Sequence, residues 1–182
     1  MIIDIKTGGA ERWHELQTAA YAGMDLFDVD FDEGAHRYSV DGVVLPSVTQ
    51  VITRFVPQHG DQAAMQRGTA VHIACHLLIK GILDWGTVDP RMMGWLTSFA
   101  EWLQRTGFEV EQSEQRGANP LHGYAGTLDL RGIIPGALPS LMRGALYLQE
   151  NGSIARFKAH NGRDDFKVFV GMLNFFKWEQ GG

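Results

Sequence analysis

The segment Met1-Ile-Ile-Asp-Ile-Lys-Thr-Gly-Gly9 begins with β-branched apolar residues and ends in two glycines, which predicts a short strand followed by a turn. Side chains alternate between the faces of a strand, so Asp4 and Lys6 share one face, and Ile3 and Ile5 share the other. A carboxylate beside an ammonium group can hold a divalent cation and orient a water molecule. An exposed ion pair is the commoner meaning of Asp-x-Lys, so the pattern alone leaves both interpretations open.

The rest of the chain predicts helices and strands in mixed order. Apolar spacing indicates helices at 10–24, 63–81, 90–106 and 163–178, and a short helix after Ser47 as N-cap. Strands are expected at 37–40, 43–45, 108–115, 124–131, 144–149 and 153–158. Asn151-Gly152 predicts a tight hairpin turn between the last two strands. We expect one domain over 1–182, with 1–24 as a strand–helix segment and the acidic stretch 25–34 as a linker.

Length and composition exclude several classes of protein. The chain has 182 residues, of which 45% are hydrophobic, enough for one domain with a buried core. No apolar run approaches the roughly 20 residues of a membrane span, and no basic-then-apolar leader is present, so we expect a soluble cytoplasmic protein without a membrane partner. The single cysteine, Cys75, excludes an internal disulfide and a multi-cysteine zinc or iron–sulfur site.

The charge of the chain is unevenly distributed. Its net value of −5 argues against non-specific coating of nucleic acid, because such binding depends on neutralising many phosphates. Residues 25–66 carry seven acids and two bases, whereas residues 131–182 carry seven bases and four acids. These segments fit two oppositely charged faces, and they fit ordinary solvated surface equally well.

Two further residues are candidates for chemistry. Gly126-Thr-Leu-Asp129 places an acid in an otherwise apolar strand, which is costly unless the acid is paired or binds a metal. A strand-end aspartate that caps a turn is the simpler interpretation. His72 lies on the preceding helix, where a histidine is more often a core or surface residue than a ligand. His76 follows one turn later, but no third zinc ligand follows at a recognised spacing.

Gln17 and Tyr21, which share one face of the first expected helix, complete a set of four spaced elements. The set resembles the motifs of the RecB-like branch of the PD-(D/E)XK nuclease superfamily: Asp4-Ile-Lys6 followed by Thr-Gly, Gln17-x-x-x-Tyr21, Gly68-x-x-x-His72 and Gly126-Thr-x-Asp129. The sequence around these motifs is similar to that of compact nucleases encoded by phages and prophages. The similar stretches are Trp13-x-x-x-Gln17, His36-x-Tyr38 and Leu45-Pro-Ser-Val-Thr49. The resemblance covers nearly the whole chain.

The resemblance implies an α/β mixed (α+β) fold with a restriction-endonuclease-like core, in which a central mixed β-sheet is flanked by helices. The strand order is permuted: in the family the Asp-x-Lys strand and the next helix follow the Gly-Thr-x-Asp strand. Here residues 1–24 come first, as if moved from a point near Leu141 and Met142, and the linker would span the new join. Three explanations remain open: a natural or engineered permutation, an exchange of residues 1–24 between subunits of a homo-oligomer, or a numbering that departs from the expressed chain.

The resemblance also implies a site for Mg²⁺ or Mn²⁺. Asp129, Asp4, the backbone carbonyl of Ile5 and His72 would hold the ion, since magnesium prefers oxygen ligands and an imidazole nitrogen favours manganese somewhat. Lys6 would position the attacking water and offset charge on the phosphate.

Three other residues receive supporting roles. Gln17 and Tyr21 would contact the DNA or the site from the adjacent helix, and Glu114 is an additional candidate acid beside the metal ligands. We therefore expect a metal-dependent deoxyribonuclease, an exonuclease of phage-type recombination or DNA processing, with DNA and a recombination protein as partners. Relatives with an iron–sulfur cluster carry four cysteines, so none is expected here. The alternative is a catalytically inactive DNA-binding or assembly module that retains the nuclease fold.

Overall fold

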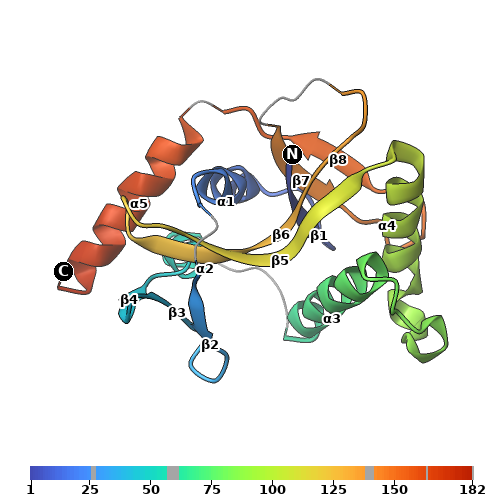
Figure 1. The fold of residues 1–182 in the computed structure, drawn as a ribbon, viewed down its shortest axis with the longest axis horizontal. Coiled ribbons are helices and arrows are strands. Elements are labelled where there is room, and N and C mark those ends of the chain that lie inside the picture. The colour runs from blue at the N-terminus through green and yellow to red at the C-terminus, as the bar shows by residue number, and fades with distance from the viewer. Residues whose placement is uncertain (26–27, 57–61, 138–141, 163, 182) are drawn as a thin grey trace.

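A computed structural model describes residues 1–25, 28–56, 62–137, 142–162 and 164–181. Its centre is a mixed five-stranded sheet, and a smaller antiparallel sheet lies beside it (Figure 1). The large sheet has the order β5 (Glu109–Asn119), β6 (Tyr124–Ile133), β1 (Ile2–Lys6), β7 (Arg143–Tyr147) and β8 (Arg156–Ala159). The small sheet contains β2 (Asp30–Asp32), β3 (Arg37–Val40) and β4 (Val43–Leu45). The expected mixed α+β architecture with a central mixed sheet is confirmed.

The first strand of the chain is the middle strand of the large sheet. β1 runs antiparallel to β6, where Ile3 pairs with Leu130, and parallel to β7, where Ile3 pairs with Gly144. The amino group of Met1 donates a hydrogen bond to the carbonyl oxygen of Gly132 (2.7 Å), near the end of β6. The amino-terminal segment therefore lies where a hairpin return from β6 would place it.

This position bears on the permuted order. Residues 1–24 reach the strand that carries Asp129 within one chain, so no exchange with a second copy is needed to build the sheet. The backbone N–H of Ile2 donates to the carbonyl oxygen of Met142 (2.9 Å), beside the expected point of removal. Leu141, the other residue at that point, lies outside the described residues.

Helices cover both faces of the large sheet, and each face has its own apolar core. Figure 1 shows α3 (Gln62–Ile79) and α4 (Met93–Thr106) on one side, and α1 (Trp13–Ala22) and α5 (Asp165–Glu179) on the other. The short α2 (Val48–Thr53) joins the second group. The first core includes Ile3, Ile5, Val71, Cys75, Trp95, Phe99, Leu130 and Leu146. The second core includes Ala20, Tyr21, Val48, Val51, Ile52, Tyr124, Leu128, Phe169 and Leu173.

One helix begins where its sequence signal indicates, and two begin later than expected. Ser47 is the N-cap of α2, and its hydroxyl accepts from the N–H of Gln50 while the Gln50 side chain accepts from the N–H of Ser47. α4 begins at Met93, after the 3₁₀ turns Trp85–Thr87 and Pro90–Met92, and therefore starts three residues later than expected. α5 begins at Asp165, and its expected first residue, Arg163, lies outside the described residues.

The predicted turn at Asn151-Gly152 is wrong in its geometry. β7 and β8 do pair antiparallel, but Tyr147 pairs with Arg156, so the connection is a long loop rather than a two-residue turn. The loop is held by α4, because the N–H of Gln149 donates to the Ser98 hydroxyl (2.9 Å). Asn151-Gly152 still lies in a turn within this loop, where the N–H of Gly152 donates to the carbonyl oxygen of Gln149 (3.1 Å).

The stretch 25–34, expected as a linker, contains a short strand. Asp30–Asp32 forms β2, which pairs with β3 and gives the small sheet a third strand. Phe31 turns toward Tyr38 (ring centroids 4.6 Å apart), while the two flanking acids are exposed. At its start the segment is tied to β5, because Asp25 and Ala118 exchange backbone hydrogen bonds. A short strand thus forms within a stretch whose composition is dominated by acids.

The strands β5 and β6 extend beyond their expected ends, to Asn119 and Ile133. Asp129 therefore lies inside a strand, and its interpretation as a turn-capping residue is wrong. Within the described part of the chain, no helix combines the length and the apolar composition that crossing a bilayer requires.

Candidate metal centre

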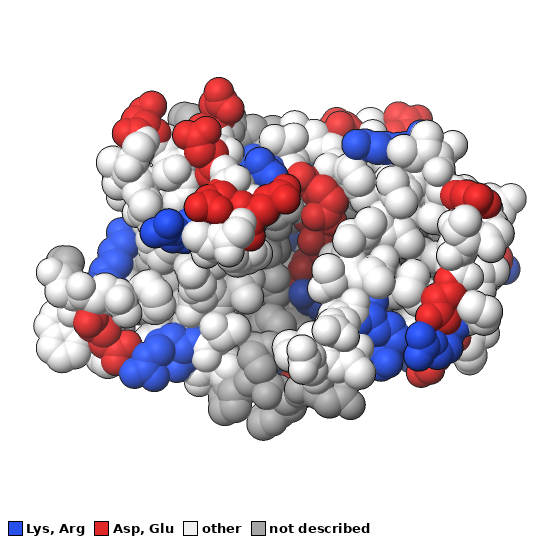
Figure 2. Space-filling model, turned by 90° about the horizontal axis from the view of Figure 1, so that it is seen from below, with Lys and Arg blue, Asp and Glu red and all other residues white. Residues whose placement is uncertain are grey.

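A cavity of about 490 Å³ lies between β1, β5 and β6, the helices α1 and α3, and the small sheet. Figure 2 shows it as a central hollow, with Asp and Glu side chains along part of its wall. Seven of the eight expected site residues line it, and they come from four separated segments of the chain: Asp4, Lys6, Gln17, Tyr21, His72, Glu114 and Asp129. The eighth, Ile5, touches the site through its backbone. The structure thus brings the expected residues together.

One side of the cavity is a chain of polar contacts from β1 to α1, which we call the lysine wall (Asp4, Lys6, Gln17 and Tyr21). The Lys6 ammonium lies 2.8 Å from the Asp4 carboxylate and donates to the Gln17 side-chain oxygen at 3.2 Å. The Gln17 amide in turn donates to the Tyr21 hydroxyl at 2.7 Å. The expected helical pairing of Gln17 with Tyr21 is confirmed, and its effect is to fix the position of Lys6.

Asp4 is the most buried acid of the site, with 1% of the residue exposed. Burial raises the pKa of Asp4 to about 7, the nearby Asp129 also raises it, and Lys6 opposes both. Its Oδ2 atom is buried and makes no well-aligned hydrogen bond within the described residues, although the Lys6 ammonium is close. A buried carboxylate oxygen with free lone pairs is a suitable ligand for a hard cation.

Next to the lysine wall, on the neighbouring strands and on α3, lies the acid wall (His72, Glu114 and Asp129). One ligand atom from each residue lies within 4.8 Å of the other two, close enough to share an ion. His72 Nδ1 lies 3.6 Å from Asp129 Oδ2, and the N–H of Ile5 donates to the same oxygen at 2.6 Å. This last bond joins the amino-terminal strand to the distant aspartate.

The charges of the acid wall are coupled. Burial alone would raise the pKa of Asp129, but His72, Lys6 and the N–H of Ile5 together hold that pKa below its usual value. Burial would likewise lower the pKa of His72, but the Asp129 carboxylate outweighs it and raises that pKa. Each group therefore favours the charged form of the other.

Glu114 has two unusual properties. Its φ angle of 53° lies in the left-handed region, which is uncommon for a residue other than glycine inside a strand. Burial and the repulsion of Asp129 raise the pKa of Glu114 to about 7. Backbone strain of this kind persists where surrounding structure enforces it, and it clusters at functional sites. Glu114 therefore has a more direct place in the site than the supporting role expected from sequence.

The ligand set of the acid wall differs from the expected one. Glu114 joins His72 and Asp129, while Asp4 falls outside the set whose atoms lie within 4.8 Å and is engaged by Lys6 instead. The carbonyl of Ile5 as a ligand stays a prediction. His76 Nδ1 contacts the Ser113 hydroxyl (2.8 Å) and does not line the cavity.

Sequence reasoning missed several residues of the cavity. Arg116 and Thr127 face each other across β5 and β6, two residues along each strand from Glu114 and Asp129. The period of two in a strand could have placed both on the same face as the acids. The flanking motifs His36-x-Tyr38 and Leu45-Pro-Ser-Val-Thr49 also reach the cavity, through His36, Tyr38, Ser47, Val48 and Thr49.

Comparison of the chain with known family models, with curated proteins and with solved structures found no match in any of the three.

Proposed function

We propose that the chain is a divalent-metal-dependent deoxyribonuclease that hydrolyses phosphodiester bonds, and that its finer role is that of an exonuclease in phage-type recombination or DNA processing. The observation that carries the proposal is the bond from the N–H of Ile5 to the Asp129 carboxylate (2.6 Å). It joins the Asp-x-Lys strand to the Gly-Thr-x-Asp strand, so that both meet His72 in one cavity.

The donor set fits Mg²⁺ or Mn²⁺. His72, Glu114 and Asp129 would hold the ion, and the free lone pairs of Asp4 Oδ2 point to a further ligand. A divalent cation at such a site neutralises charge on the phosphate and makes a water nucleophilic at neutral pH. The ion would also relieve the crowding of three carboxyl groups in one cavity.

The polar groups of the lysine wall give the chain its own contribution to the reaction. An ammonium group has three N–H donors, and in Lys6 two of them face Asp4 and Gln17. The ammonium also lies 5.4 Å from the centre of the Trp13 ring. Its third N–H would donate to an oxygen of the phosphate or of the attacking water and stabilise the developing charge there. Gln17 and Tyr21 hold the ammonium in place.

A second candidate is a DNA-binding or assembly module without chemistry. One contact favours it: the Lys6 ammonium lies 2.8 Å from the Asp4 carboxylate, so each group partly neutralises the charge of the other. The two functions differ in what they predict for DNA in the presence of metal, since only the nuclease shortens it.

The test is incubation of the whole protein with labelled linear duplex, circular duplex and single-stranded DNA, in Mg²⁺, Mn²⁺ or chelator. We expect cleavage only with metal, and a loss of about 100- to 1,000-fold in rate for Asp129→Asn and for Lys6→Ala. Asp164→Asn and Lys167→Ala are matched controls, because this exposed pair (2.9 Å) lies outside the cavity. Resistance of the circular substrate would identify an exonuclease.

Calorimetric titration with Mn²⁺ gives a readout that does not depend on cleavage. We expect binding by the wild type and by Asp164→Asn, and a large loss of affinity in Asp129→Asn. DNA that stays intact with metal while still binding would favour the module. Cleavage by Asp129→Asn at the wild-type rate would contradict the nuclease.

A further inference from the structure

Three aromatic rings of the small sheet line the cavity beside the acid wall. Phe31 lies on β2, His36 in the turn that follows and Tyr38 on β3. The Phe31 ring is 5.1 Å from the His36 ring, nearly perpendicular to it, and 4.6 Å from the Tyr38 ring. Tyr38 is buried, Phe31 is half-buried and His36 is exposed, so the cluster rises from the core to the surface. It forms an aromatic ledge (Phe31, His36 and Tyr38).

Two contacts fix this aromatic ledge to the large sheet. The Tyr38 hydroxyl lies 2.9 Å from the Thr127 hydroxyl, and the Arg116 guanidinium lies over the Phe31 ring at 4.9 Å from its centre. Arg116 and Thr127 are cross-strand partners. Each lies two residues along its strand from an acid of the acid wall, which corresponds to about 7 Å between Cα atoms. The ledge is therefore a rigid neighbour of the proposed metal site.

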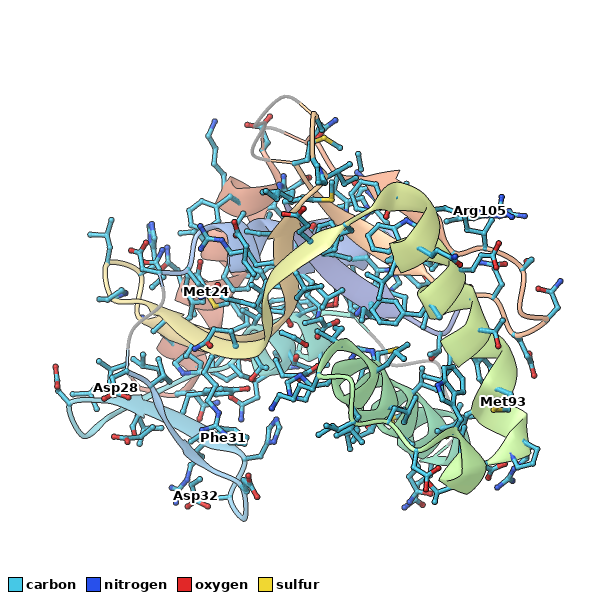
Figure 3. All side chains as sticks on the ribbon, turned by 45° about the vertical axis from the view of Figure 1, so that its right-hand side comes forward. Met24, Asp28, Phe31, Asp32, Met93 and Arg105 are labelled. Carbon is cyan, nitrogen blue, oxygen red and sulfur yellow. The ribbon has the colours of Figure 1, made fainter. Side chains whose placement is uncertain are left out.

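The charge around the ledge indicates what it can bind. Four exposed acids lie next to the ledge in the sequence, at Asp28, Asp30, Asp32 and Glu33, and they would repel the phosphates of a DNA backbone that approaches from their side. Figure 2 shows acidic side chains gathered on this side of the hollow, and Figure 3 shows Phe31 between the small sheet and the large sheet, with Asp28 and Asp32 at the outer ends. Neutral aromatic bases do not suffer this repulsion.

We propose that Phe31, His36 and Arg116 stack against an unpaired nucleobase adjacent to the phosphate in the cavity. Aromatic rings and guanidinium planes are the groups on which proteins stack single-stranded bases. A base in a duplex is covered by its neighbours in the stack, so the substrate is single-stranded DNA or a frayed end. This inference rests on the proposed nuclease function and names the form of DNA that the same cavity accepts.

The test measures binding separately from cleavage. A single-stranded oligodeoxynucleotide of about ten nucleotides, carrying 2-aminopurine, is titrated with the whole protein in Ca²⁺ and in chelator, alongside a fully paired duplex. We expect Phe31→Leu to weaken single-strand binding about 5- to 100-fold and to leave duplex binding within about twofold. The change in 2-aminopurine fluorescence that accompanies stacking should disappear with it.

Companion variants separate stacking from folding. Leucine at position 31 keeps the apolar contact with Tyr38, so the melting temperature should stay close to the wild type, while Phe31→Trp should retain binding. Arg116→Lys keeps the charge and removes the planar group, and should also weaken single-strand binding. Phe175→Ala is the matched control, because its ring is 45% exposed on α5 and does not line the cavity.

The outcomes distinguish this inference from the proposed function. Cleavage by the wild type together with unchanged binding in Phe31→Leu overturns the stacking ledge and leaves the nuclease. Binding that depends on Phe31 without any cleavage supports the ledge and rejects the nuclease. Equal losses of single-strand and duplex binding in Phe31→Leu overturn the stacking proposal, because they show that Phe31 supports the structure of the site rather than stacking on a base.

Discussion

The lysine wall and the acid wall face the same cavity but differ in their balance of charge. In the lysine wall an acid, an ammonium, an amide and a phenol follow one another with contacts of 2.8, 3.2 and 2.7 Å. In the acid wall two carboxylates and one imidazole lie together, and Asp4 from the lysine wall adds a third acid beside Asp129. In the lysine wall an ammonium offsets the one acid, whereas the acid wall has a surplus of negative charge.

The difference appears in the pKa values of the acids. Asp129, which has His72, Lys6 and a backbone N–H as partners, has a lowered pKa. Glu114 and Asp4 both have a pKa of about 7, mainly because burial disfavours their charge. The cavity therefore holds protons at neutral pH that a cation would displace. Fixed geometry on one side and unbalanced charge on the other are what a metal-dependent site requires.

The largest expected effect comes from breaking the lysine wall. In Lys6→Met the buried Asp4 loses its ammonium partner, which should lower the free energy of unfolding by about 3–5 kcal/mol at pH 8. The loss should shrink toward pH 6, because Asp4 can then take up a proton. Urea unfolding in chelator measures it.

Two controls accompany that measurement. The double variant Asp4→Asn/Lys6→Met removes both charges and should recover most of the stability. Lys158→Met breaks an ion pair with Glu15 (3.3 Å) whose lysine side chain is 50% exposed, and should change stability by less than about 1 kcal/mol. Equal losses of unfolding free energy in Lys6→Met and Lys158→Met would show that the Lys6–Asp4 pair contributes no more than an exposed ion pair.

Removing an acid from the acid wall should raise the stability of the protein in chelator, whereas breaking the lysine wall should lower it. The folded pKa of Glu114, about 7, lies above the unfolded value, so the folded state binds more protons between these values and stability falls as pH rises through that window. Glu114→Gln removes this loss. In chelator it should be more stable than the wild type at pH 8 by about 1–2 kcal/mol, allowing for its partial exposure, and equal to it near pH 5.

The measurement is a series of thermal melts from pH 5 to pH 8. Mn²⁺ should reverse the order at pH 8, because the wild type keeps the ligand that the variant lacks. Glu101→Gln, which breaks a surface pair with Arg105 on α4, is the control and should show no pH-dependent gain. If the wild type were more stable than Glu114→Gln at pH 8 in chelator, the raised pKa of Glu114 would not be the cause of a stability loss at high pH.

The lysine wall could be predicted from sequence, and the acid wall only in part. Asp4 and Lys6 are two residues apart in a strand, and Gln17 and Tyr21 four apart in a helix, so local periodicity places each pair. That the two pairs meet depends only on a short connection between neighbouring elements. Local rules therefore give most of the geometry of this wall.

The acid wall depends on contacts between distant parts of the chain. Glu114 reaches the site through a left-handed backbone conformation, and no residue pattern in β5 indicates it. Pairing of β1 with β6 sets the bond from Ile5 to Asp129, and only the resemblance suggested that neighbourhood. The sequence did not indicate the aromatic ledge, because Phe31 lies in a segment that is dominated by acids. Tertiary packing decides all three.

The smallest expected effect sharpens the comparison within the lysine wall. Tyr21→Phe removes the hydroxyl that accepts from Gln17, and a buried hydrogen bond of this kind contributes about 1 kcal/mol. Tyr124→Phe is a close match, because its buried hydroxyl donates to the Ala20 carbonyl (2.8 Å) and its side chain does not line the cavity. The two variants should lose similar stability in urea unfolding. Only Tyr21→Phe should also slow cleavage, by about 3- to 10-fold, since a free Gln17 holds Lys6 less firmly. Equal cleavage rates in the two variants would mean that the wall supports the fold and does not position the lysine.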